Sequence, residues 1–173
     1  MNDLQIREAR PNDREAIKAV TLAAYQEYAT LMQAHWEIYR QNIVATLADI
    51  QPAAQLVADQ AGQLVGTVLL YPAGTIVANP GNEPITLPWP EVRLLAVSPT
   101  ARGQGVGAAL MQECIRRARQ SSRVLTLHTT DIMQSAMRLY ARMGFQRAPE
   151  LDFQPAPGVT IKGFRLSLEE TAS

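Results

Sequence analysis

The chain has 173 residues, with 16 basic and 16 acidic side chains and a formal net charge of zero. This length suits one domain over residues 1–173 with enough apolar content to close a core. The balanced charge, without a lysine-rich tract, gives no electrostatic footprint for nucleic acid or an anionic membrane, so we expect a small molecule or a peptide end as partner.

The N-terminal residues, the cysteine and the two histidines limit the location and the metal binding that we expect. Residues 1–10 are polar and charged, and no later run reaches the roughly 18 apolar residues of a membrane span, so we expect a cytoplasmic location. Cys114 is the one cysteine and faces the core on periodicity, and the two histidines lie far apart. No metal site is predicted.

The first fifty residues predict a strand and two helices. Apolar and polar residues alternate over residues 4–9, and Pro11-Asn12-Asp13 then supplies turn and capping residues. Apolar residues at helical spacing predict a helix from about Asp13 and a second over 38–50, joined by a connector at 30–34.

Two hairpins should follow. Residues 55–59 and 64–70 are apolar strand patterns on either side of a short turn with glycine. Residues 75–78 and 85–87 flank Asn79-Pro80-Gly81-Asn82, which has a type II turn signature. We expect an extended hairpin arm there.

The remaining elements alternate strand and helix. We expect strands at 91–97 and 124–129, a helix from Gly105 to about Gln120, and a helix over 133–143 capped by Gly144. The first of these helices should bury one face, made of Leu110, Met111, Cys114, Ile115 and Ala118. Closing strands are predicted at 145–147 and 160–168, with a loop over 148–158 between them and frayed ends at 1–2 and 169–173.

The most informative segment joins the strand ending at Val97 to the following helix. Arg102 precedes three alternate glycines, at 103, 105 and 107. Glycine lets the backbone approach a ligand with its N–H groups bare, and a helix N-terminus carries positive potential. This pattern predicts an anion over residues 103–107.

Other glycine motifs fit less well. A dinucleotide fingerprint needs its first glycine directly after the strand and an acidic residue about twenty positions later, but five residues intervene and Arg123 stands at the acidic place. A Walker loop needs Gly-Lys-Ser or Gly-Lys-Thr, which the sequence lacks. If the turn bound no ligand, each glycine within the helix would cost about 1 kcal/mol of stability with no compensating interaction.

The arginine and glycine pattern resembles the pyrophosphate-binding motif of the GNAT superfamily of acyl-coenzyme A-dependent N-acyltransferases. Arg102, Gly105 and Gly107 fill its required places, and residues 136–145, with Tyr140 and Gly144-Phe145, resemble its second signature. The order of predicted elements is also that of the GNAT fold. The resemblance implies a single-domain α/β protein with a mixed central sheet of about seven strands flanked by four helices.

The resemblance also implies a binding site for acetyl-coenzyme A. The backbone of the strand before the turn would pair with the pantetheine arm, and the turn would hold the diphosphate. The corresponding residues are Leu95, Ala96, Val97, Arg102, Gly103, Gln104, Gly105, Val106, Gly107 and Ala108. Small or apolar side chains at 95–97 would equally suit a buried strand.

The GNAT resemblance implies catalytic roles for two residues of this chain. Tyr140 would lie near the coenzyme sulfur as general acid, although helical spacing also suits a core aromatic. Glu91 would be the general base, acting through water, although it could be a solvated strand start beside Pro90. Met133 departs from the family, since many members have asparagine there; Asp131 or Gln134 would have to replace its polar contact.

The acceptor pocket would come from the connector between the first helices and from the proline-rich arm. Half of the four residues Tyr25, Tyr28, Trp36 and Tyr39 should be core, and His128 is predicted to be structural. Glu27 and Glu37 would bind a cationic amine or be surface charges. The aromatic candidates are Tyr25, Tyr28, His35, Trp36, Tyr39 and Trp89.

The sequence thus predicts an acetyl-CoA-dependent N-acetyltransferase whose amine substrate attacks the thioester directly in a ternary complex. A small-molecule primary amine is the first choice of acceptor and a protein or peptide amino group the second. A coenzyme A-binding sensor without catalysis remains an alternative, as does a homodimer, which is frequent in the family.

Overall fold

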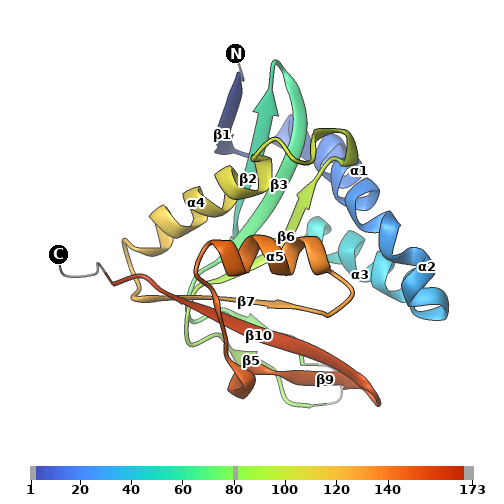
Figure 1. Cartoon of the computed structure of the whole chain (residues 1–173), viewed down its shortest axis with the longest axis vertical. Coiled ribbons are helices and arrows are strands. Elements are labelled where there is room, and N and C mark those ends of the chain that lie inside the picture. The colour runs from blue at the N-terminus through green and yellow to red at the C-terminus, as the bar shows by residue number, and fades with distance from the viewer. Residues whose placement is uncertain (1–2, 80–81, 170–173) are drawn as a thin grey trace. The chain divides into compact units, whose positions relative to one another are not determined.

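The computed structural model describes residues 3–79 and 82–169 (Figure 1). Its contacts divide the chain into two compact units, Met1–Leu70 with Leu94–Glu113, and Tyr71–Arg93 with Cys114–Ser173. Strand β6 (Glu91–Val97) and helix α4 (Val106–Ala118) contribute residues to both units. Among the described residues, no helix combines the length and apolar character needed to cross a membrane.

The strands of the first unit are ordered β1-β2-β3-β6. β1 (Leu4–Glu8) pairs antiparallel with β2 (Ala54–Gln60), which pairs antiparallel with β3 (Gln63–Tyr71). Ala61 and Gly62 between β2 and β3 both have positive φ, 53° and 86°, as a two-residue type I′ turn requires. The predicted first strand and hairpin are confirmed.

Helices precede the hairpin in the first unit. After a 3-10 turn, η1 (Pro11–Asp13), come α1 (Arg14–Tyr25) and, further on, α3 (Trp36–Ala48), close to the two predicted helices. The predicted connector at 30–34 lies within a longer helical segment, residues 26–35, which contains no glycine or proline and leaves helical geometry only at Gln33, with φ 49°. This segment comprises η2 (Gln26–Tyr28), α2 (Ala29–Met32) and η3 (Gln33–His35).

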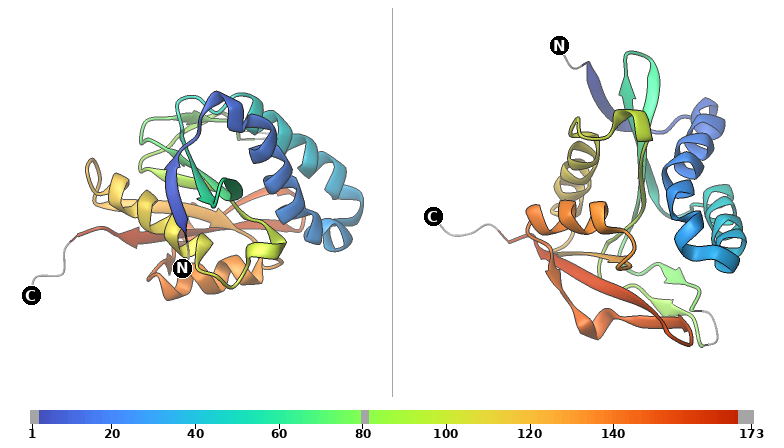
Figure 2. Two further views of the ribbon diagram at one scale, coloured as in Figure 1. Left: turned by 90° about the horizontal axis from the view of Figure 1, so that it is seen from above. Right: turned by 45° about the vertical axis from the view of Figure 1, so that its right-hand side comes forward.

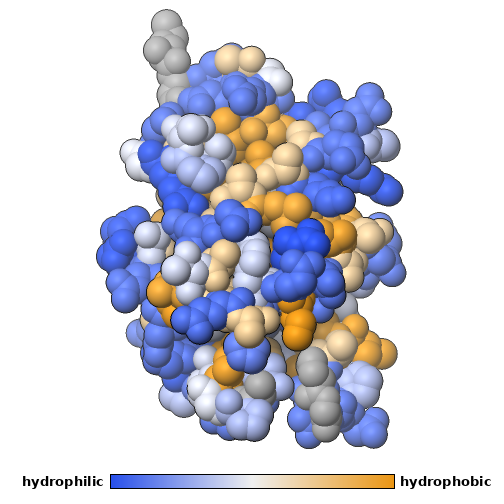
Figure 3. Space-filling model, turned by 90° about the vertical axis from the view of Figure 1, so that its right-hand side faces the viewer, coloured by the Kyte–Doolittle hydropathy of each residue, from blue (hydrophilic) through white to orange (hydrophobic). Residues whose placement is uncertain are grey.

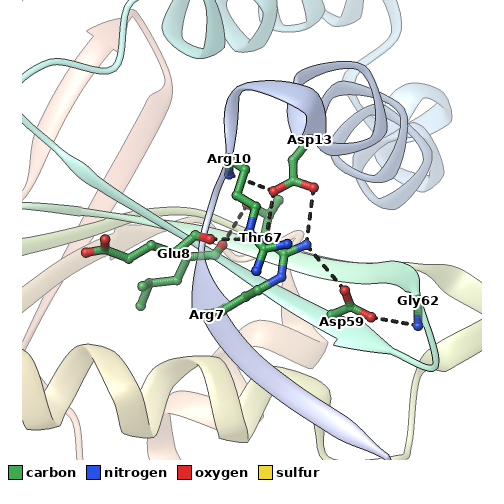
Figure 4. A network of polar contacts seen from close by, with 8 residues as sticks. Arg7, Glu8, Arg10, Asp13, Asp59, Gly62 and Thr67 are labelled. Atoms are coloured by element: carbon green, nitrogen blue, oxygen red, sulfur yellow. Dashed lines mark hydrogen bonds and ion pairs between the residues drawn. The ribbon is translucent and has the colours of Figure 1, made fainter.

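An arginine-centred network fastens β1 to the hairpin and to the first helix (Figure 4). Arg7 donates to both carboxylate oxygens of Asp13, at 2.8 and 3.2 Å, and to Asp59 at 3.3 Å. Asp13 also accepts the N–H of Arg10, and Asp59 that of Gly62. A bidentate arginine pair of this kind fixes geometry as well as charge.

Helices cover both faces of the first unit's strands, with α1 and α3 on one side and the start of α4 on the other (Figure 2). Gly66 on β3 permits the close approach of α4. A Cβ at Gly66 would lie 2.9 Å from Val106 Cγ1, 3.0 Å from Leu110 Cδ1 and 3.1 Å from the carbonyl oxygen of Ala96. The predicted buried face of α4 is confirmed, since its five members are at most 9% exposed.

The second unit begins with the hairpin arm. β4 (Ile76–Val77) pairs antiparallel with β5 (Ile85–Thr86), which confirms the predicted arm. The N–H of Asn82 donates to Asn79 O across the predicted turn at 2.9 Å. The central residues of that turn, 80 and 81, lie outside the described residues, as do 1–2 and 170–173 of the predicted frayed ends.

The second unit's main strands are ordered β6-β7-β10-β8. β7 (Val124–Thr129) is parallel to β6 and antiparallel to β10 (Val159–Ser167), which also pairs with β8 (Gln146–Arg147). The predicted mixed sheet is confirmed.

The predicted loop over 148–158 is wrong in part. It contains the 3-10 turn η5 (Pro149–Leu151) and strand β9 (Phe153–Ala156), which runs beside β10 in Figure 1 and brings the sheet to eight strands. Pro155 suggests a loop in the sequence but is tolerated in an edge strand. α5 (Gln134–Arg142) ends before Gly144, whose φ of 94° confirms the predicted cap.

Candidate active site

The glycine turn follows β6 in the first unit. The Ser98 N–H donates to Val65 O on β3 at 2.8 Å, which fixes the end of β6, and a 3-10 turn, η4 (Pro99–Ala101), follows. Gly103 and Gly105 then have φ of 75° and 80°, and a Cβ at either would meet no atom within 4 Å. Glycine is therefore required here by the backbone conformation, and the space beside the turn is open.

Helix α4 begins at this turn. The N–H of Ala109 donates to Gly105 O at 3.0 Å, the first hydrogen bond of the helix. The N–H groups of Val106, Gly107 and Ala108 therefore have no acceptor within the helix. Together with the positive end of the helix, they form an arrangement that suits an anion.

Arg102 begins the glycine turn and makes two contacts with the α1 region. Its Nη1 lies 2.6 Å from Glu27 Oε2 and its Nη2 donates to Ala24 O at 3.1 Å. The side chains of Arg102 and Glu27 are 37% and 42% exposed, so this ion pair is open to solvent and to exchange of partners. The predicted diphosphate contact of Arg102 stays a prediction.

The end of β6 departs from regular strand geometry. Leu94 has φ of 51°, and the next residue, Leu95, accepts a hydrogen bond on its carbonyl from the Tyr25 hydroxyl at 3.1 Å. Ala96 is 2% exposed, whereas Leu95 and Val97 are half-buried. A positive φ is strained for a leucine, and such backbone strain is common at functional sites.

Four of the aromatic candidates gather where α1 and α3 meet. Tyr25 lies 5.9 Å from Tyr28 and 6.0 Å from Tyr39, and Trp36 stacks on Tyr39 at 6.3 Å. Burial, the largest cause, raises the pKa of Tyr28 and of Tyr39 to about 12. Tyr25 is buried and the other three rings are half-buried, so packing accounts for part of this aromatic cluster.

Nearby surface residues take different roles. His35 and Glu37 are exposed, and Glu37 pairs with Arg40 at 2.7 Å. Leu31 on α2 and Ile38 on α3 are more than 60% exposed; the face that carries these helices mixes apolar and polar residues (Figure 3). Trp89, in the second unit, is 41% exposed.

Glu91, at the start of β6 in the second unit, is a buried carboxylate with two cationic partners. Its side chain is 1% exposed, its Oε1 lies 2.6 Å from His128 Nδ1, and its Oε2 accepts a hydrogen bond from Arg93 Nε. The Arg93 guanidinium lies 5.5 Å from the ring centre of Tyr71. Glu91 is therefore not a solvated strand start.

His128 is held from its other side by the turn η5. Its Nε2 lies 2.9 Å from Leu151 O, and the Phe153 ring meets it edge-on at 5.4 Å. Gly163, opposite His128 on β10, makes this approach possible, since a Cβ there would lie 2.4 Å from Leu151 Cβ and 3.0 Å from Ala148 O.

A polar support holds η5 in place. Asp152 accepts the Gly163 N–H at 2.8 Å and pairs with Arg147 through both of its oxygens, each at 2.8 Å. Arg147 also donates to Gly163 O. These contacts fix the backbone that carries the Leu151 carbonyl.

The electrostatics of Glu91 and His128 reflect their pairing. Burial by itself would raise the pKa of Glu91, but hydrogen bonds and charge from His128 and Arg93 hold it below its ordinary value. Burial by itself would lower the pKa of His128, but Glu91 and the Leu151 carbonyl raise it above its ordinary value. The structure therefore favours a charged pair.

Tyr140 is 7% exposed, and its ring meets Phe145 edge-on with 5.8 Å between centres. Met133, directly before α5, is buried. Asp131, one of its two predicted substitutes, pairs with Lys162 at 2.6 Å, and the other, Gln134, is exposed.

Two hydroxyls at the end of β7 are a feature that the sequence did not indicate. Thr129 Oγ1 and Thr130 Oγ1 are buried and have no hydrogen-bond partner among the described residues. Buried hydroxyls without partners are uncommon, so these groups are open to a bound polar molecule.

Other sites offer less. Cys114 is fully buried. Over residues 3–79 and 82–169, no group of three or more histidine, cysteine, aspartate or glutamate side chains suits a metal ion. A pocket of about 610 Å³ between β1, α1 and α3 includes no residue of the predicted site.

Comparison with known proteins decides the family. The model of the acetyltransferase (GNAT) family matches residues 21–145, which include β6, the glycine turn, α4 and the Tyr140 helix. The chain belongs to this family. The GNAT resemblance read from the arginine, the glycines and the tyrosine signature is thereby confirmed.

Named relatives of this GNAT chain are acetyltransferases. Mouse N-acetyltransferase 8B is 32% identical over 127 residues, which are 73% of this chain and 52% of that protein. A mycothiol acetyltransferase from a Parafrankia strain is 28% identical over 155 residues, 84% of this chain and 48% of that protein. The chain spans about half the length of the curated relatives it matches.

Solved GNAT structures share the fold. A GNAT acetyltransferase from Staphylococcus aureus Mu50 has a TM-score of 0.69 and 17% identity, covering 96% of this chain and 99% of that one. One from Brucella melitensis in complex with acetyl-CoA has a TM-score of 0.62 and 23% identity, covering 100% and 93%.

The sequence reasoning missed the partners of two predicted residues. It treated His128 as structural without linking it to Glu91, although strand alternation places Thr126 and His128 on one face of β7 and the register sets Glu91 beside Thr126. It gave no partner for Arg102, which lies 75 positions from Glu27, and no local pattern signals such a contact.

Proposed function

We propose that this GNAT protein is an acetyl-CoA-dependent N-acetyltransferase that acts on the primary amine of a small molecule by direct attack in a ternary complex. The observation that carries the proposal is the glycine turn, where positive φ, open space and N–H groups without helical acceptors coincide at the start of α4. These features suit an anionic group such as a diphosphate.

The donor would be held by backbone groups. In this proposal, residues 103–108 bind the diphosphate through N–H groups, Arg102 adds a charge-assisted contact, and the backbone of Leu95, Ala96 and Val97 pairs with the pantetheine arm. The Brucella neighbour's acetyl-CoA complex supports this donor. Positioning of this kind supplies much of the rate, because effective molarities of well-oriented reactants reach about 10⁵ M or more.

Proton transfers complete the proposed reaction. The amine nitrogen bonds to the acetyl carbon, the carbon–sulfur bond breaks, Glu91 receives the amine proton, and Tyr140 protonates the departing thiolate. The contact of Glu91 with His128, a group that can share its proton, supports the base role, and the family signature around Tyr140 supports the acid role. General acid or base catalysis contributes about 10² to 10⁴ in rate.

A small-molecule acceptor is the first choice, and a protein or peptide amino group the second. The balance of 16 acidic and 16 basic residues favours no strongly charged macromolecular partner. Mycothiol acetyltransferase, among the relatives, is named for a small molecule. Homodimerisation of this chain is proposed from the family resemblance alone.

The experiment incubates the protein with acetyl-CoA and a panel of amines and follows free thiol. We expect amine-dependent thiol release, reduced about 100-fold by Tyr140→Phe, which keeps the ring and removes the hydroxyl. Ser135→Ala is the control, because it removes an exposed hydroxyl from the same helix. Binding of acetyl-CoA without amine-dependent release would instead identify a sensor without catalysis.

A further inference from the structure

Glu91 is a deeply buried charged side chain, 1% exposed, and its proposed role as a base depends on what its two oxygens contact. Both of its oxygens are engaged, Oε1 with His128 and Oε2 with Arg93. A carboxylate that is neutralised on both sides is a weak base by itself. Whether Glu91 can accept a proton therefore depends on the protonation state of His128.

The contacts of His128 fix where its protons lie. Leu151 O is a carbonyl and can only accept, so Nε2, 2.9 Å away, carries a hydrogen. Nδ1 and Glu91 Oε1 are 2.6 Å apart, a distance that needs a proton between them. The resting pair therefore holds one shared proton, as an imidazolium beside a carboxylate.

The two members of the pair differ in access. The His128 side chain is 19% exposed and that of Glu91 is 1% exposed. Proton exchange with the surroundings therefore runs through the imidazole, while the carboxylate anchors the pair in the sheet.

We propose that Glu91 and His128 act as one unit in acyl transfer, and that the pair becomes the base only after its shared proton has left. In the base form, a carboxylate stands beside a neutral imidazole, and the distance between Nδ1 and Oε1 lengthens because no proton then lies between them. The amine proton then enters the pair as the carbon–nitrogen bond forms, and it returns to solvent before the next turnover. This inference rests on the proposed function and makes His128 a positioning and proton-sharing residue.

The charges outside the pair oppose each other, so the protonated form of His128 is favoured mainly by Glu91 itself. Arg93 on β6 contacts Glu91, and Asp152 after η5 interacts with His128, so one cation and one anion oppose each other. Asp152 is itself paired with Arg147 on β8, which reduces its influence. On β10, Arg165 lies opposite Thr126 and pairs with Glu150.

The base form should therefore appear only at higher pH. The pKa of His128 is raised above its ordinary value of 6.5, chiefly by Glu91 once burial has been overcome. Turnover at saturating substrate should rise with pH through a midpoint above 6.5. A carboxylate acting alone, with the lowered pKa of Glu91, would give turnover independent of pH in this range.

The first test is the pH dependence of kcat in the wild type and in His128→Asn. Asparagine can still donate to Glu91 but cannot titrate. We expect the variant to lose the rise above pH 6.5 and to fall in kcat by about 10-fold or more. Two amines of different basicity separate the enzyme's titration from the substrate's. An unchanged rise in His128→Asn would overturn the proposal.

The second test needs no activity. His35 and His128 are the chain's two histidines, so His35→Gln leaves a single imidazole whose titration NMR can follow. We expect a midpoint above 6.5, which falls below 6.5 when Glu91→Gln is added, because burial and Arg93 then act without the carboxylate. A His128 midpoint that does not change when Glu91→Gln is added would contradict a proton shared between Glu91 and His128.

The two proposals fail separately. If the wild type releases no thiol with any amine, the proposed function fails, while the NMR titration still reports on the pair. If the enzyme is active but the pH profile of His128→Asn matches the wild type, the function stands and the pair is only structural.

Discussion

Arg102 at the glycine turn and Glu27 after α1 form an ion pair with 2.6 Å between Nη1 and Oε2. Arg102 also donates to the Ala24 carbonyl, so its guanidinium is oriented by two groups of the α1 region. A solvent-exposed pair of this kind contributes at most about 1 kcal/mol. A diphosphate beside the N-terminus of α4 would be a stronger partner for the same cation.

We predict that Arg102→Ala weakens acetyl-CoA binding by about 10- to 100-fold, the size of a lost hydrogen bond to a charged group. Glu27→Gln should change affinity by less than about 5-fold, toward tighter binding, because it removes a competitor worth about 1 kcal/mol or less. Calorimetric titration measures both.

Arg123→Ala is the matched control for this charge loss, since Arg123 is 84% exposed and pairs only loosely with Glu169, at 3.4 Å. Equal weakening by Arg102→Ala and Arg123→Ala would mean that Arg102 makes no specific contact with the donor.

Sequence periodicity predicted α4 because one of its faces is buried, and continuous apolar runs predicted strands such as β3, whose residues 65–71 are all buried. The turn η5 and strand β9 escaped because proline and polar residues obscure their alternation. The candidate site divides in the same way. The special backbone conformation at Gly103 and Gly105 could be predicted from the neighbouring residues. The contact of His128 with Leu151 could not, because the two residues are 23 positions apart in the sequence and are brought together only by folding.

Gly66 offers a test of the packing behind the glycine turn. Gly66→Ala should destabilise the protein by about 1 to 3 kcal/mol, because the new Cβ would meet Val106 at 2.9 Å and the rigid Ala96 carbonyl at 3.1 Å. Urea unfolding measures the change. A loss of less than about 1 kcal/mol would contradict close packing at Gly66.

Gly163 tests the support of His128. Gly163→Ala should push η5 away from β10, because Leu151 Cβ would lie 2.4 Å from the new methyl group, and should cost about 1 to 3 kcal/mol of stability. Loss of the Leu151 contact removes one cause of the raised His128 pKa, so the NMR midpoint of this histidine should fall. A lower stability with an unchanged midpoint would show that Leu151 does not influence the ring.

Asp152 gives a prediction for the acid range. Hydrogen bonds from Arg147, then from the Gly163 N–H, lower its pKa from 3.8 to about 2. A carboxyl whose folded pKa is depressed stabilises the protein fully above its unfolded pKa and loses this contribution as the pH falls toward the folded value. Asp152→Asn should therefore lower Tm at neutral pH, and its difference from the wild type should shrink between about pH 4 and pH 2. Thermal unfolding at several pH values measures this, with Asp3→Asn as an exposed carboxyl control. A Tm difference that stays constant down to pH 2 would show that the carboxylate charge of Asp152 does not support the turn that carries Leu151.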